Sequence, residues 1–475
     1  MQIELIAPAS EDSAYLPRLG LGTLAALTPP EDEVIYTDDV IRPFDLERDL
    51  KDVDLVGISV DSKTASRAYQ IAEAYRRRGV KVVLGGIHPT AVPEEAAQFA
   101  DSVVLSEAEE LWPQLLRDFK AGHLAPRYRG PLPSLGGHPA PRRDLFTSRK
   151  YVPFQVVQTM RGCPYPCEFC SVSTANGSTL RFRPVDEVIA ELRHLGKLIL
   201  FADDNVMIHR KYSGELFTRL KELNKTWIGQ CSLAAVKNLD NIKLMADSGC
   251  TALFIGFESV DEKTLRGTGK QQNRPEQYRE VVQNLHEHGI STWGSFVFGF
   301  DTDDSEVFDR TVEFGIDARL TMALFALLTP YPGTKLYRRL LSEGRLTDPR
   351  WWLRSDHDAG SPYYLPKRMT REQLREGWQR AWQRFYSTGS ILDRWEISRR
   401  SGWIQIAGYL PLNLFQQRLV ARKILGGQQR FRSRPEEDAS GTPEWLSERL
   451  AGIALPADPQ PTFLPEEALS RARGG

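Results

Sequence analysis

Three cysteines in a C-x-x-x-C-x-x-C spacing are the residues of this chain best suited to chemistry. They are Cys163, Cys167 and Cys170, in the run Arg-Gly-Cys-Pro-Tyr-Pro-Cys-Glu-Phe-Cys. A structural zinc site takes four protein ligands, and ordinary [4Fe-4S] carriers use four cysteines. Three thiolates with no obvious fourth partner therefore predict a metal centre with one open coordination position, at which chemistry can take place.

The same spacing also describes one face of a helix. Gly162, Pro164 and Pro166 argue against a helix, because proline removes a backbone donor and drives the residue before it toward extended geometry. The segment is therefore predicted to be a loop that turns its sulfurs toward one point. Two alternatives stay open, namely buried thiols that bind nothing and a three-cysteine zinc site completed by a distant histidine.

The loop resembles the signature of the radical S-adenosylmethionine (radical SAM) superfamily, in which an aromatic residue, here Phe169, precedes the last cysteine. The resemblance implies a [4Fe-4S] cluster held by the three cysteines, with SAM chelating the open iron. It also implies reductive cleavage of SAM to a 5'-deoxyadenosyl radical. An electron donor such as flavodoxin or ferredoxin is then expected as a protein partner.

Short apolar runs alternate with amphipathic stretches after the cysteines, which is typical of repeated βα units. Helices are expected at residues 185–195, 216–223, 277–288 and 306–314. Six strands are expected to start near Val156, Leu198, Trp227, Ala252, Thr292 and Met322. Six such units fit the partial (β/α)6 TIM-like barrel of this superfamily better than a closed eightfold barrel, and we expect that barrel at residues 151–345.

Residues that end these strands are expected to bind ligands, because parallel βα folds bind at the carboxyl ends of their strands. By resemblance, Phe169 and four strand-end residues match positions near SAM in the superfamily: Asp203, Asp204, Glu258 and Pro330. Each also has a structural interpretation, since Asp and Asn after a strand commonly cap a helix or make a turn. No residue is singled out as a catalytic acid, base or nucleophile.

The first 124 residues alternate strands and helices again. Strands are expected at 3–6, 34–36, 55–60, 82–84 and 103–105, and helices at 65–78, 94–99 and 108–119. This alternation predicts an α/β doubly wound sheet of flavodoxin-like kind, which binds its ligand over the strand ends. The segment resembles the cobalamin-binding domain fused to many radical SAM enzymes. The resemblance implies cobalamin as a cofactor, with contacts from Ser59, Gly85, Gly86, His88 and Glu107.

The chain departs from the usual cobalamin-binding pattern in one loop. Many such domains carry D-x-H-x-x-G, whose histidine ligates cobalt, but the matching residues 8–22 contain no histidine. His88 follows two glycines and could approach a corrin face, or it could be a turn histidine with no ligand role. Ser106 stands where relatives usually have glycine. A vestigial first domain that binds no cobalamin is therefore the competing interpretation.

The rest of the chain separates by composition. Residues 125–150 are rich in proline, glycine and arginine and predict an interdomain linker. Residues 346–425 predict a small helical domain with Thr370 as an N-cap, and residues 426–475 a poorly ordered tail. Pro411 and polar residues break the stretch 403–425 too often for it to span a bilayer. Packing on the catalytic domains is preferred there over a basic amphipathic helix on a membrane surface.

Composition favours a large enzyme over a nucleic-acid-binding protein. The 475 residues are 41% hydrophobic and carry a net charge of −1, which gives no basic field for nucleic acid. No signal peptide is expected, because Met1 leads directly into a strand and Glu4 is charged. A cytoplasmic, reducing compartment is therefore predicted.

Together these features predict a radical SAM enzyme that uses cobalamin to methylate an unactivated carbon of a small-molecule or lipid-like substrate. One alternative is a radical SAM cyclase, oxidase or rearrangement enzyme with a vestigial first domain. A second alternative is a non-enzymatic, zinc-stabilised binding module. Nothing in the residues distinguishes a lipid, a sugar, a peptide or a tetrapyrrole precursor as the substrate.

Overall fold

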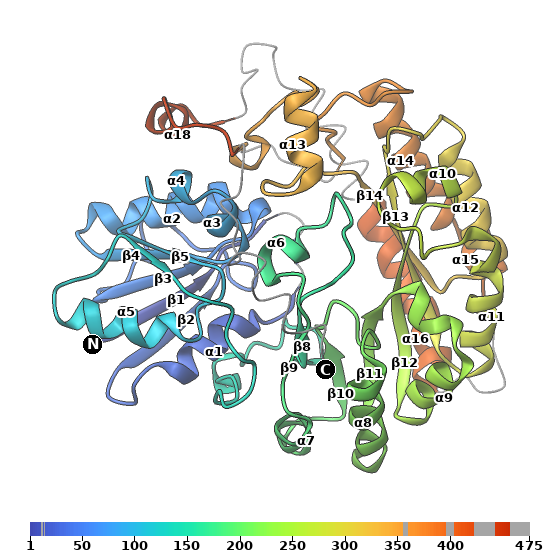
Figure 1. The fold of residues 1–475 in the computed structure, drawn as a ribbon, viewed down its shortest axis with the longest axis horizontal. Coiled ribbons are helices and arrows are strands. Elements are labelled where there is room, and N and C mark those ends of the chain that lie inside the picture. The colour runs from blue at the N-terminus through green and yellow to red at the C-terminus, as the bar shows by residue number, and fades with distance from the viewer. Residues whose placement is uncertain (11–12, 14, 355–359, 396–402, 422–441, 457–475) are drawn as a thin grey trace, which may run out of the picture.

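The computed structural model describes residues 1–10, 13, 15–354, 360–395, 403–421 and 442–456. Two parallel sheets lie side by side, the first in the amino-terminal part (blue) and the second in the barrel part (green to yellow) (Figure 1). Helices cover both faces of the first sheet and the outside of the second (Figure 1). This arrangement confirms the predicted α/β fold class.

The first sheet has six parallel strands in the order β2-β1-β3-β4-β5-β6. The first five follow the flavodoxin-like order, and the sixth comes from the segment predicted to be a linker. A sheet covered on both faces produces nearly continuous apolar runs, which explains why five strands were predictable. The strands are β1 (Gln2–Ala7), β2 (Glu33–Asp38), β3 (Leu55–Ser59), β4 (Lys81–Gly85), β5 (Ser102–Leu105) and β6 (Arg127–Arg129).

Five helices connect these strands. Helix α1 begins at Leu19, inside the stretch predicted to be a loop. The run Leu-Gly-Leu-Gly at its start made this helix hard to predict from the sequence, because glycine is less favourable in a helix than alanine by about 1 kcal/mol. The helices are α1 (Leu19–Leu27), α2 (Ala65–Arg77), α3 (Ile87–Ala91), α4 (Pro93–Ala96) and α5 (Leu111–Lys120).

The second sheet runs in chain order through six parallel strands, and its first and last strands do not pair with each other. It is therefore an open (β/α)6 barrel, and each strand starts within two residues of its predicted position. The strands are β7 (Gln155–Val157), β10 (Leu198–Phe201), β11 (Thr226–Cys231), β12 (Cys250–Glu258), β13 (Ser291–Phe298) and β14 (Met322–Leu327). The helices are α7 (Val185–His194), α8 (Arg210–Leu220), α9 (Leu239–Asp247), α10 (Glu262–Gly267), α11 (Tyr278–Glu287), α12 (Val307–Asp317) and α13 (Lys335–Ser342).

The cysteines lie in a loop that starts from a short antiparallel ribbon. Its strands are β8 (Met160–Arg161) and β9 (Arg181–Phe182), and helix α6 (Val172–Asn176) lies between them in the chain. Residues 162–170 form no helix, which confirms the prediction made from the prolines.

Helix α14 (Arg371–Phe385) covers the outer edge of β14. The indole Nε1 groups of Trp378 and Trp382 both donate to the carbonyl of Phe325, at 2.8 and 3.0 Å. The Tyr386 hydroxyl donates to the carbonyl of Ala323 at 2.8 Å and accepts from its amide at 3.2 Å. Side chains of the helical region thus bind backbone groups of β14 that would otherwise pair with a further strand. This helps to end the barrel at six strands.

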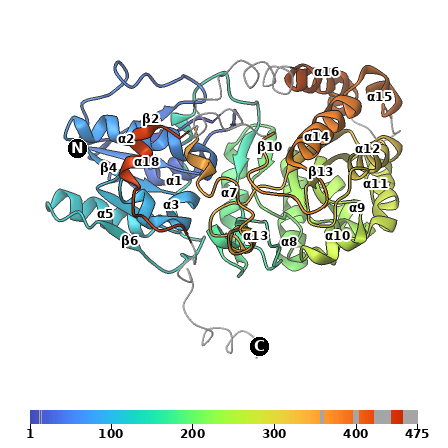
Figure 2. The same cartoon turned by 90° about the horizontal axis from the view of Figure 1, so that it is seen from above.

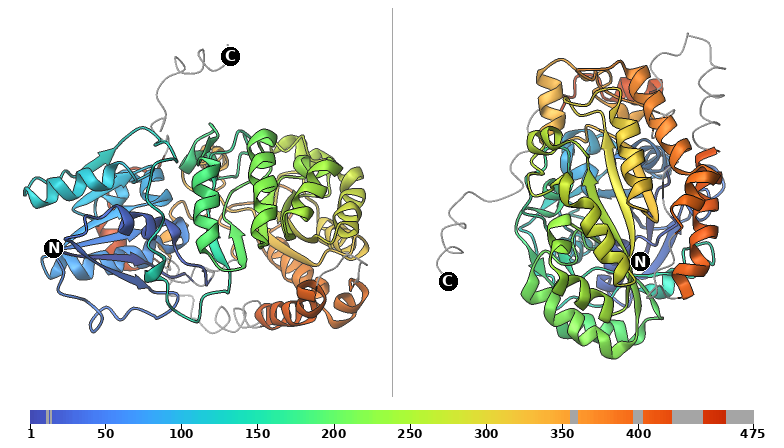
Figure 3. Two further views of the ribbon diagram at one scale, coloured as in Figure 1. Left: turned by 90° about the horizontal axis from the view of Figure 1, so that it is seen from below. Right: turned by 90° about the vertical axis from the view of Figure 1, so that its right-hand side faces the viewer.

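The region predicted to be one helical domain divides between the two parts of the molecule. Helices α14, α15 (Thr388–Asp393) and α16 (Trp403–Val420) lie along the barrel (Figure 3). Thr370 caps α14 through a capping box with Gln373, as predicted for the N-cap. The 3₁₀ turn Trp351–Leu353 instead packs into the core of the first domain.

Helix α18 (Glu444–Arg449) also packs on the first domain, where Leu446 is fully buried (Figures 1 and 2). It lies within residues 426–475, which the sequence predicts to be a poorly ordered tail; residues 426–441 and 457–475 of that tail lie outside the described part of the chain. The difference arises because the burying surface belongs to residues far away in the chain. Among the residues that the structure describes, none of the helices has the length and apolarity needed to cross a bilayer.

Candidate functional site

Cys163, Cys167 and Cys170 share one partly buried neighbourhood. Burial, together with the nearby Cys167 and Cys163, raises the pKa of Cys170 to about 11. Within the described part of the chain, no three Cys, His, Asp or Glu side chains are arranged to hold a single metal ion. Three thiol donors at one loop nevertheless fit a cluster with one iron left free for another ligand.

Two glycines allow the cysteine loop to pack closely. Gly162 has φ +95°, and a Cβ there would collide with the Thr179 carbonyl oxygen. Gly269 has φ +80°, and a Cβ there would lie 3.1 Å from the Pro166 carbonyl oxygen. Only glycine adopts such backbone angles without strain. Gly162 therefore lets the start of the loop lie against Thr179, and Gly269 lets segment 268–270 lie against Pro166.

Glu168, between the second and third cysteines, anchors the loop to helix α13. The Arg339 guanidinium donates to both carboxylate oxygens, at 2.9 and 3.2 Å. Such two-pronged pairs fix orientation as well as distance. The loop is therefore held by side chains as well as by its own backbone.

Glu258 ends β12 with φ +66° and lies near the cysteines. Its Oε1 pairs with Lys270 Nζ at 2.9 Å, and both side chains are largely buried. Burial disfavours a charged Lys270, but Glu258 and the neighbouring thiols outweigh it and raise the lysine pKa. Lys270 therefore supplies a fixed positive charge beside the cysteine loop. No sequence signal marked it, because a lone lysine in a Thr-Gly-Lys turn has no periodic pattern.

The adjacent residues Asp203 and Asp204 differ in their surroundings. Asp203 is buried and accepts hydrogen bonds from the Thr159 amide (2.6 Å), the Thr159 hydroxyl (2.5 Å) and the Met160 amide (3.1 Å). Both of its oxygens thus accept hydrogen bonds inside the protein, where they hold residues 159 and 160 in place. Asp204 is less buried, lies near Cys163 and is hydrogen-bonded by Asn176. It stays a candidate for SAM binding.

The other two candidates for SAM binding lie in packed surroundings. Phe169 packs edge-to-face on Phe300, with ring centroids 5.6 Å apart. Pro330 is buried, and its carbonyl accepts a hydrogen bond from Trp351 Nε1 at 2.9 Å. Pro330 therefore connects the end of β14 to the 3₁₀ turn that packs on the first domain.

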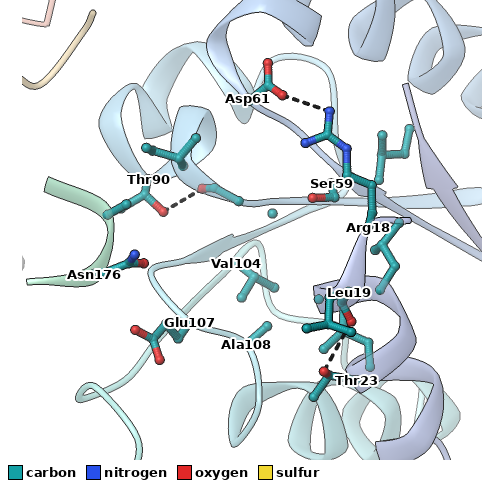
Figure 4. Close-up of a pocket in the computed structure, with 18 of the residues that line it drawn as sticks. Arg18, Leu19, Thr23, Ser59, Asp61, Thr90, Val104, Glu107, Ala108 and Asn176 are labelled. Atoms are coloured by element: carbon teal, nitrogen blue, oxygen red, sulfur yellow. Dashed lines mark hydrogen bonds and ion pairs between the residues drawn. The ribbon is translucent and has the colours of Figure 1, made fainter. Parts of the chain in front are cut away.

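A pocket of about 860 Å³ lies between the first domain and the barrel (Figure 4). Four of the five residues predicted to contact cobalamin line it, namely Ser59, Gly85, Gly86 and Glu107. Its other wall comes from the barrel side and includes residues on both sides of the cysteine loop, such as Arg161 and Asn176. A pocket at the carboxyl ends of β3, β4 and β5 is where a doubly wound sheet binds ligands.

Local backbone requirements shape this pocket. Gly86 has φ +109°, and a Cβ there would lie 2.7 Å from the Val60 carbonyl oxygen, so this turn requires glycine. The Thr90 hydroxyl donates to the Gly86 carbonyl and accepts from the Ser106 amide, both at 2.8 Å. Ser106 itself has φ +69°, which explains why glycine suits this position.

His88 does not reach the pocket. Its side chain is fully buried, with Nδ1 3.2 Å from Ser62 Oγ and Nε2 3.2 Å from the Tyr69 hydroxyl. Glu95 lies 3.3 Å from Nε2. The expectation that His88 approaches a corrin is therefore wrong, because its neighbours hold the ring in the core. Within residues 8–22, Arg18 and Leu19 line the pocket, and Arg18 pairs with Asp61 at 3.1 Å.

Comparisons with known proteins agree with this architecture. The family model described as the radical SAM superfamily matches residues 157–315, and the B12 binding domain matches residues 11–116. A domain of unknown function (DUF4070) matches residues 334–400.

Two relatives are bacteriochlorophyllide d methyltransferases of Chlorobaculum tepidum. The C-8(2) enzyme is 30% identical, over 72% of this chain and 80% of the relative. The C-12(1) enzyme is 29% identical, over 89% of this chain and 94% of the relative. Among solved structures, the radical SAM methyltransferase TsrM of Kitasatospora setae, with cobalamin and a [4Fe-4S] cluster bound, superposes with a TM-score of 0.60. It is 17% identical, over 72% of this chain and 75% of that chain, and this likeness concerns the fold.

A cobalamin-type sheet and a cysteine-bearing partial barrel that share one pocket define the class of two-cofactor radical enzymes. The chain belongs to the radical SAM superfamily, among the members that carry an amino-terminal B12-binding domain. Its cofactors are a [4Fe-4S] cluster, SAM and cobalamin. This membership rejects the alternative of a non-enzymatic, zinc-stabilised module.

Proposed function

We propose that this chain transfers a methyl group to an unactivated carbon of a small molecule. The observation that carries the proposal is the shared pocket, since residues near the cysteine loop and residues of the B12-binding sheet line the same space. A pocket of this size at an interface between domains suits a ligand that must meet two reactive groups. Both Chlorobaculum relatives are named as methyltransferases, which supports the same activity here.

Distinct residues would hold each cofactor. Cys163, Cys167 and Cys170 would bind the cluster, and the glycine turn of Gly85 and Gly86, with Ser59 and Glu107, would receive cobalamin. When bound, the cluster and SAM supply an oxidising carbon radical, and cobalamin supplies the methyl group.

The protein's own contribution is to bind and orient. Glu258 offers a carboxylate to an amino group or a ribose hydroxyl, and Lys270 keeps that carboxylate paired within the barrel. Asp204 offers a second carboxylate near Cys163. We place SAM among these three side chains and near Phe169 and Pro330.

The partners follow from the chemistry. Radical SAM enzymes need a one-electron reductant, and we propose reduced flavodoxin or ferredoxin for this role. We propose a small organic molecule, including a lipid-like one, as the substrate.

The first test is reconstitution. Protein purified without oxygen is supplied with iron, sulfide and hydroxocobalamin, desalted, and examined for metal content and absorption. We expect retained iron–sulfur and corrin bands. After a low-potential reductant has reduced the corrin, we expect transfer of the labelled methyl of SAM to it. A variant with all three cysteines replaced by alanine is expected to retain corrin but no iron.

One result would contradict methyl transfer. Protein that cleaves SAM to 5'-deoxyadenosine, but retains no corrin and takes up no labelled methyl, would favour a cobalamin-independent cyclase, oxidase or rearrangement enzyme.

A further inference from the structure

Two arginines and two glutamates form one ionic cluster between the first domain and the barrel, here called the interdomain quartet. Arg161 pairs with Glu107 at 2.7 Å and with Glu109 at 2.6 Å. Arg181 pairs with Glu107 through both terminal nitrogens, one of them at 2.8 Å. The four side chains are only 7% to 16% exposed, so water screens these charges weakly.

The two arginines lie at opposite ends of the cysteine loop. Arg161 ends β8, two residues before Cys163, and Arg181 starts β9. They pair directly opposite each other in the antiparallel ribbon. Like charges at such positions repel and destabilise a ribbon. Glu107 removes this repulsion because its carboxylate binds both guanidinium groups. It therefore holds together strands β8 and β9, which flank the cysteine loop in the chain and are here called the base of the loop.

Glu107 also belongs to the pocket. It follows β5 of the first domain, and its carboxylate lies on the side of the pocket where Asn176 of the barrel side is found (Figure 4). Glu109 and Arg161 line the same pocket. One carboxylate therefore contacts the space in which cobalamin is expected and both strands that carry the cysteine loop.

The quartet is built to stay charged. Two positive and two negative groups balance, and Arg161 Nε donates further to the Gln158 side chain at 2.8 Å. Arg181 also donates to the carbonyls of Pro133 and Asn176. Burial disfavours ionised Glu109, but Arg161 outweighs that effect and lowers the Glu109 pKa. Buried ion pairs hold when their hydrogen bonds are satisfied, and among the guanidinium nitrogens of the two arginines Arg181 Nε is the one buried donor left without a partner.

We infer that Glu107 is a positioning residue that couples occupancy of the pocket to retention of the cluster. The inference rests on the proposed placement of cobalamin and the cluster. A ligand in the pocket excludes water from one side of the quartet, which strengthens its ion pairs and holds the base of the cysteine loop closed. Because such coupling is reciprocal, the cluster strengthens cobalamin binding by the same factor.

The chain contains a matched control for this inference. Glu191 is also buried between two arginines, Arg143 at 2.5 Å and Arg183 at 2.7 Å. Its side chain is 5% exposed, close to the 7% of Glu107. None of these three residues lines the pocket. Loss of Glu191 therefore tests the effect of breaking a buried triad without touching the pocket wall.

The test measures the rate at which a chelator removes iron from the reconstituted protein, with and without saturating hydroxocobalamin. We expect cobalamin to slow iron loss by about 5-fold or more in the wild type, which is a typical coupling between two sites. The ratio of the iron-loss rate without cobalamin to the rate with cobalamin is expected to fall close to one in Glu107→Gln. In Glu191→Gln this ratio is expected to equal that of the wild type. Cluster-loaded wild type should also bind cobalamin with a lower Kd than cluster-free wild type.

The inference would be overturned if Glu107→Gln kept the wild-type ratio of iron-loss rates. It would also be overturned if Glu191→Gln lowered this ratio as much as Glu107→Gln, because loss of any buried ion pair would then weaken cluster retention. If Glu107→Gln does not fold, Arg161→Lys serves instead, because lysine keeps the charge but lacks the planar fork that binds both glutamates. It should give an intermediate ratio, and an unchanged ratio would contradict the coupling. A wild type that retains no corrin would overturn the proposed function as well, whereas a corrin-loaded protein without coupling overturns only the inference.

Discussion

Asp203 carries a buried carboxyl group whose ionisation opposes folding. Burial raises its pKa from 3.8 to about 6, although Thr159 and Met160 donate hydrogen bonds that lower it. An acid whose pKa is higher in the folded chain stabilises the fold when it is protonated. This contribution is fully present below pH 3.8 and is lost as the pH rises through about 6.

We therefore expect Asp203→Asn to flatten the pH dependence of stability between pH 4 and 6. The free energy of unfolding should change by about 2–3 kcal/mol less across this window than in the wild type. Urea unfolding of the metal-free protein, followed by tryptophan fluorescence, measures it. Asp186→Asn is the control, since that side chain is 88% exposed. If the free energy of unfolding changed with pH equally in the wild type and in Asp203→Asn, ionisation of Asp203 would not destabilise the fold.

Only part of the site was predictable residue by residue. The cysteines, the glycine turn and Glu258 stand in local patterns of spacing and strand ends. Asp203 and Asp204 look alike in the sequence, and only packing separates the enclosed carboxylate from the more open one. The role of Arg161 depends on Glu107, 54 residues away, and no local pattern encodes such a contact.

Helices α12 and α14 approach each other closely where α14 carries Gly377. A Cβ there would collide with the Phe308 ring of α12. Gly214, in helix α8, has no atom within 4 Å of its Cβ position. Packing therefore leaves no room for a side chain at Gly377, whereas at Gly214 there is room for one.

Alanine at these glycines should have effects of opposite sign. Gly377→Ala is expected to destabilise the protein by about 1–3 kcal/mol, because an overfilled contact forces the helices apart. Gly214→Ala is expected to stabilise it by about 0.5–1 kcal/mol, because alanine loses less backbone entropy in a helix. The urea concentrations at the midpoint of unfolding of the two variants, compared with that of the wild type, test this expectation. Destabilisation by both substitutions would refute the steric argument.

Elements were predictable where burial is continuous along the chain. The six barrel strands are apolar runs between helices, so their starts could be placed closely. Helix α1 and strand β6 were missed, since one contains glycines and the other is the three-residue edge strand Arg127–Arg129. Helix α18 owes its position to the core of a distant domain, which composition does not indicate.

At the scale of the whole molecule, the 3₁₀ turn Trp351–Leu353 fastens the region after the barrel to the first domain. Trp352 Nε1 donates to Glu95 Oε1 at 2.8 Å, and the same oxygen accepts from the Tyr69 hydroxyl at 3.0 Å. Trp351 and Trp352 are almost fully buried. The two domains are thus joined by this turn as well as by the segment between β6 and β7.

Trp352→Phe should weaken this connection by about 1–3 kcal/mol, because it removes one hydrogen bond from a buried carboxylate. Limited proteolysis of the folded protein is expected to cut faster near the turn than in the wild type. Trp395→Phe is the control, as Trp395 is 37% exposed. Equal cleavage rates in all three proteins would show that apolar packing alone holds the turn.

The dependence of the first domain on these late segments bears on how the protein is made. Its core contains Tyr337, Trp351, Trp352 and Leu446, which leave the ribosome long after the sheet itself. A nascent chain that ends at residue 124 would expose the apolar surface that these side chains cover, and such surface invites aggregation. The cobalamin-type sheet is therefore a separate unit of the fold, but its core is shared with segments that are synthesised late. Its folding is completed only when nearly the whole polypeptide has been translated.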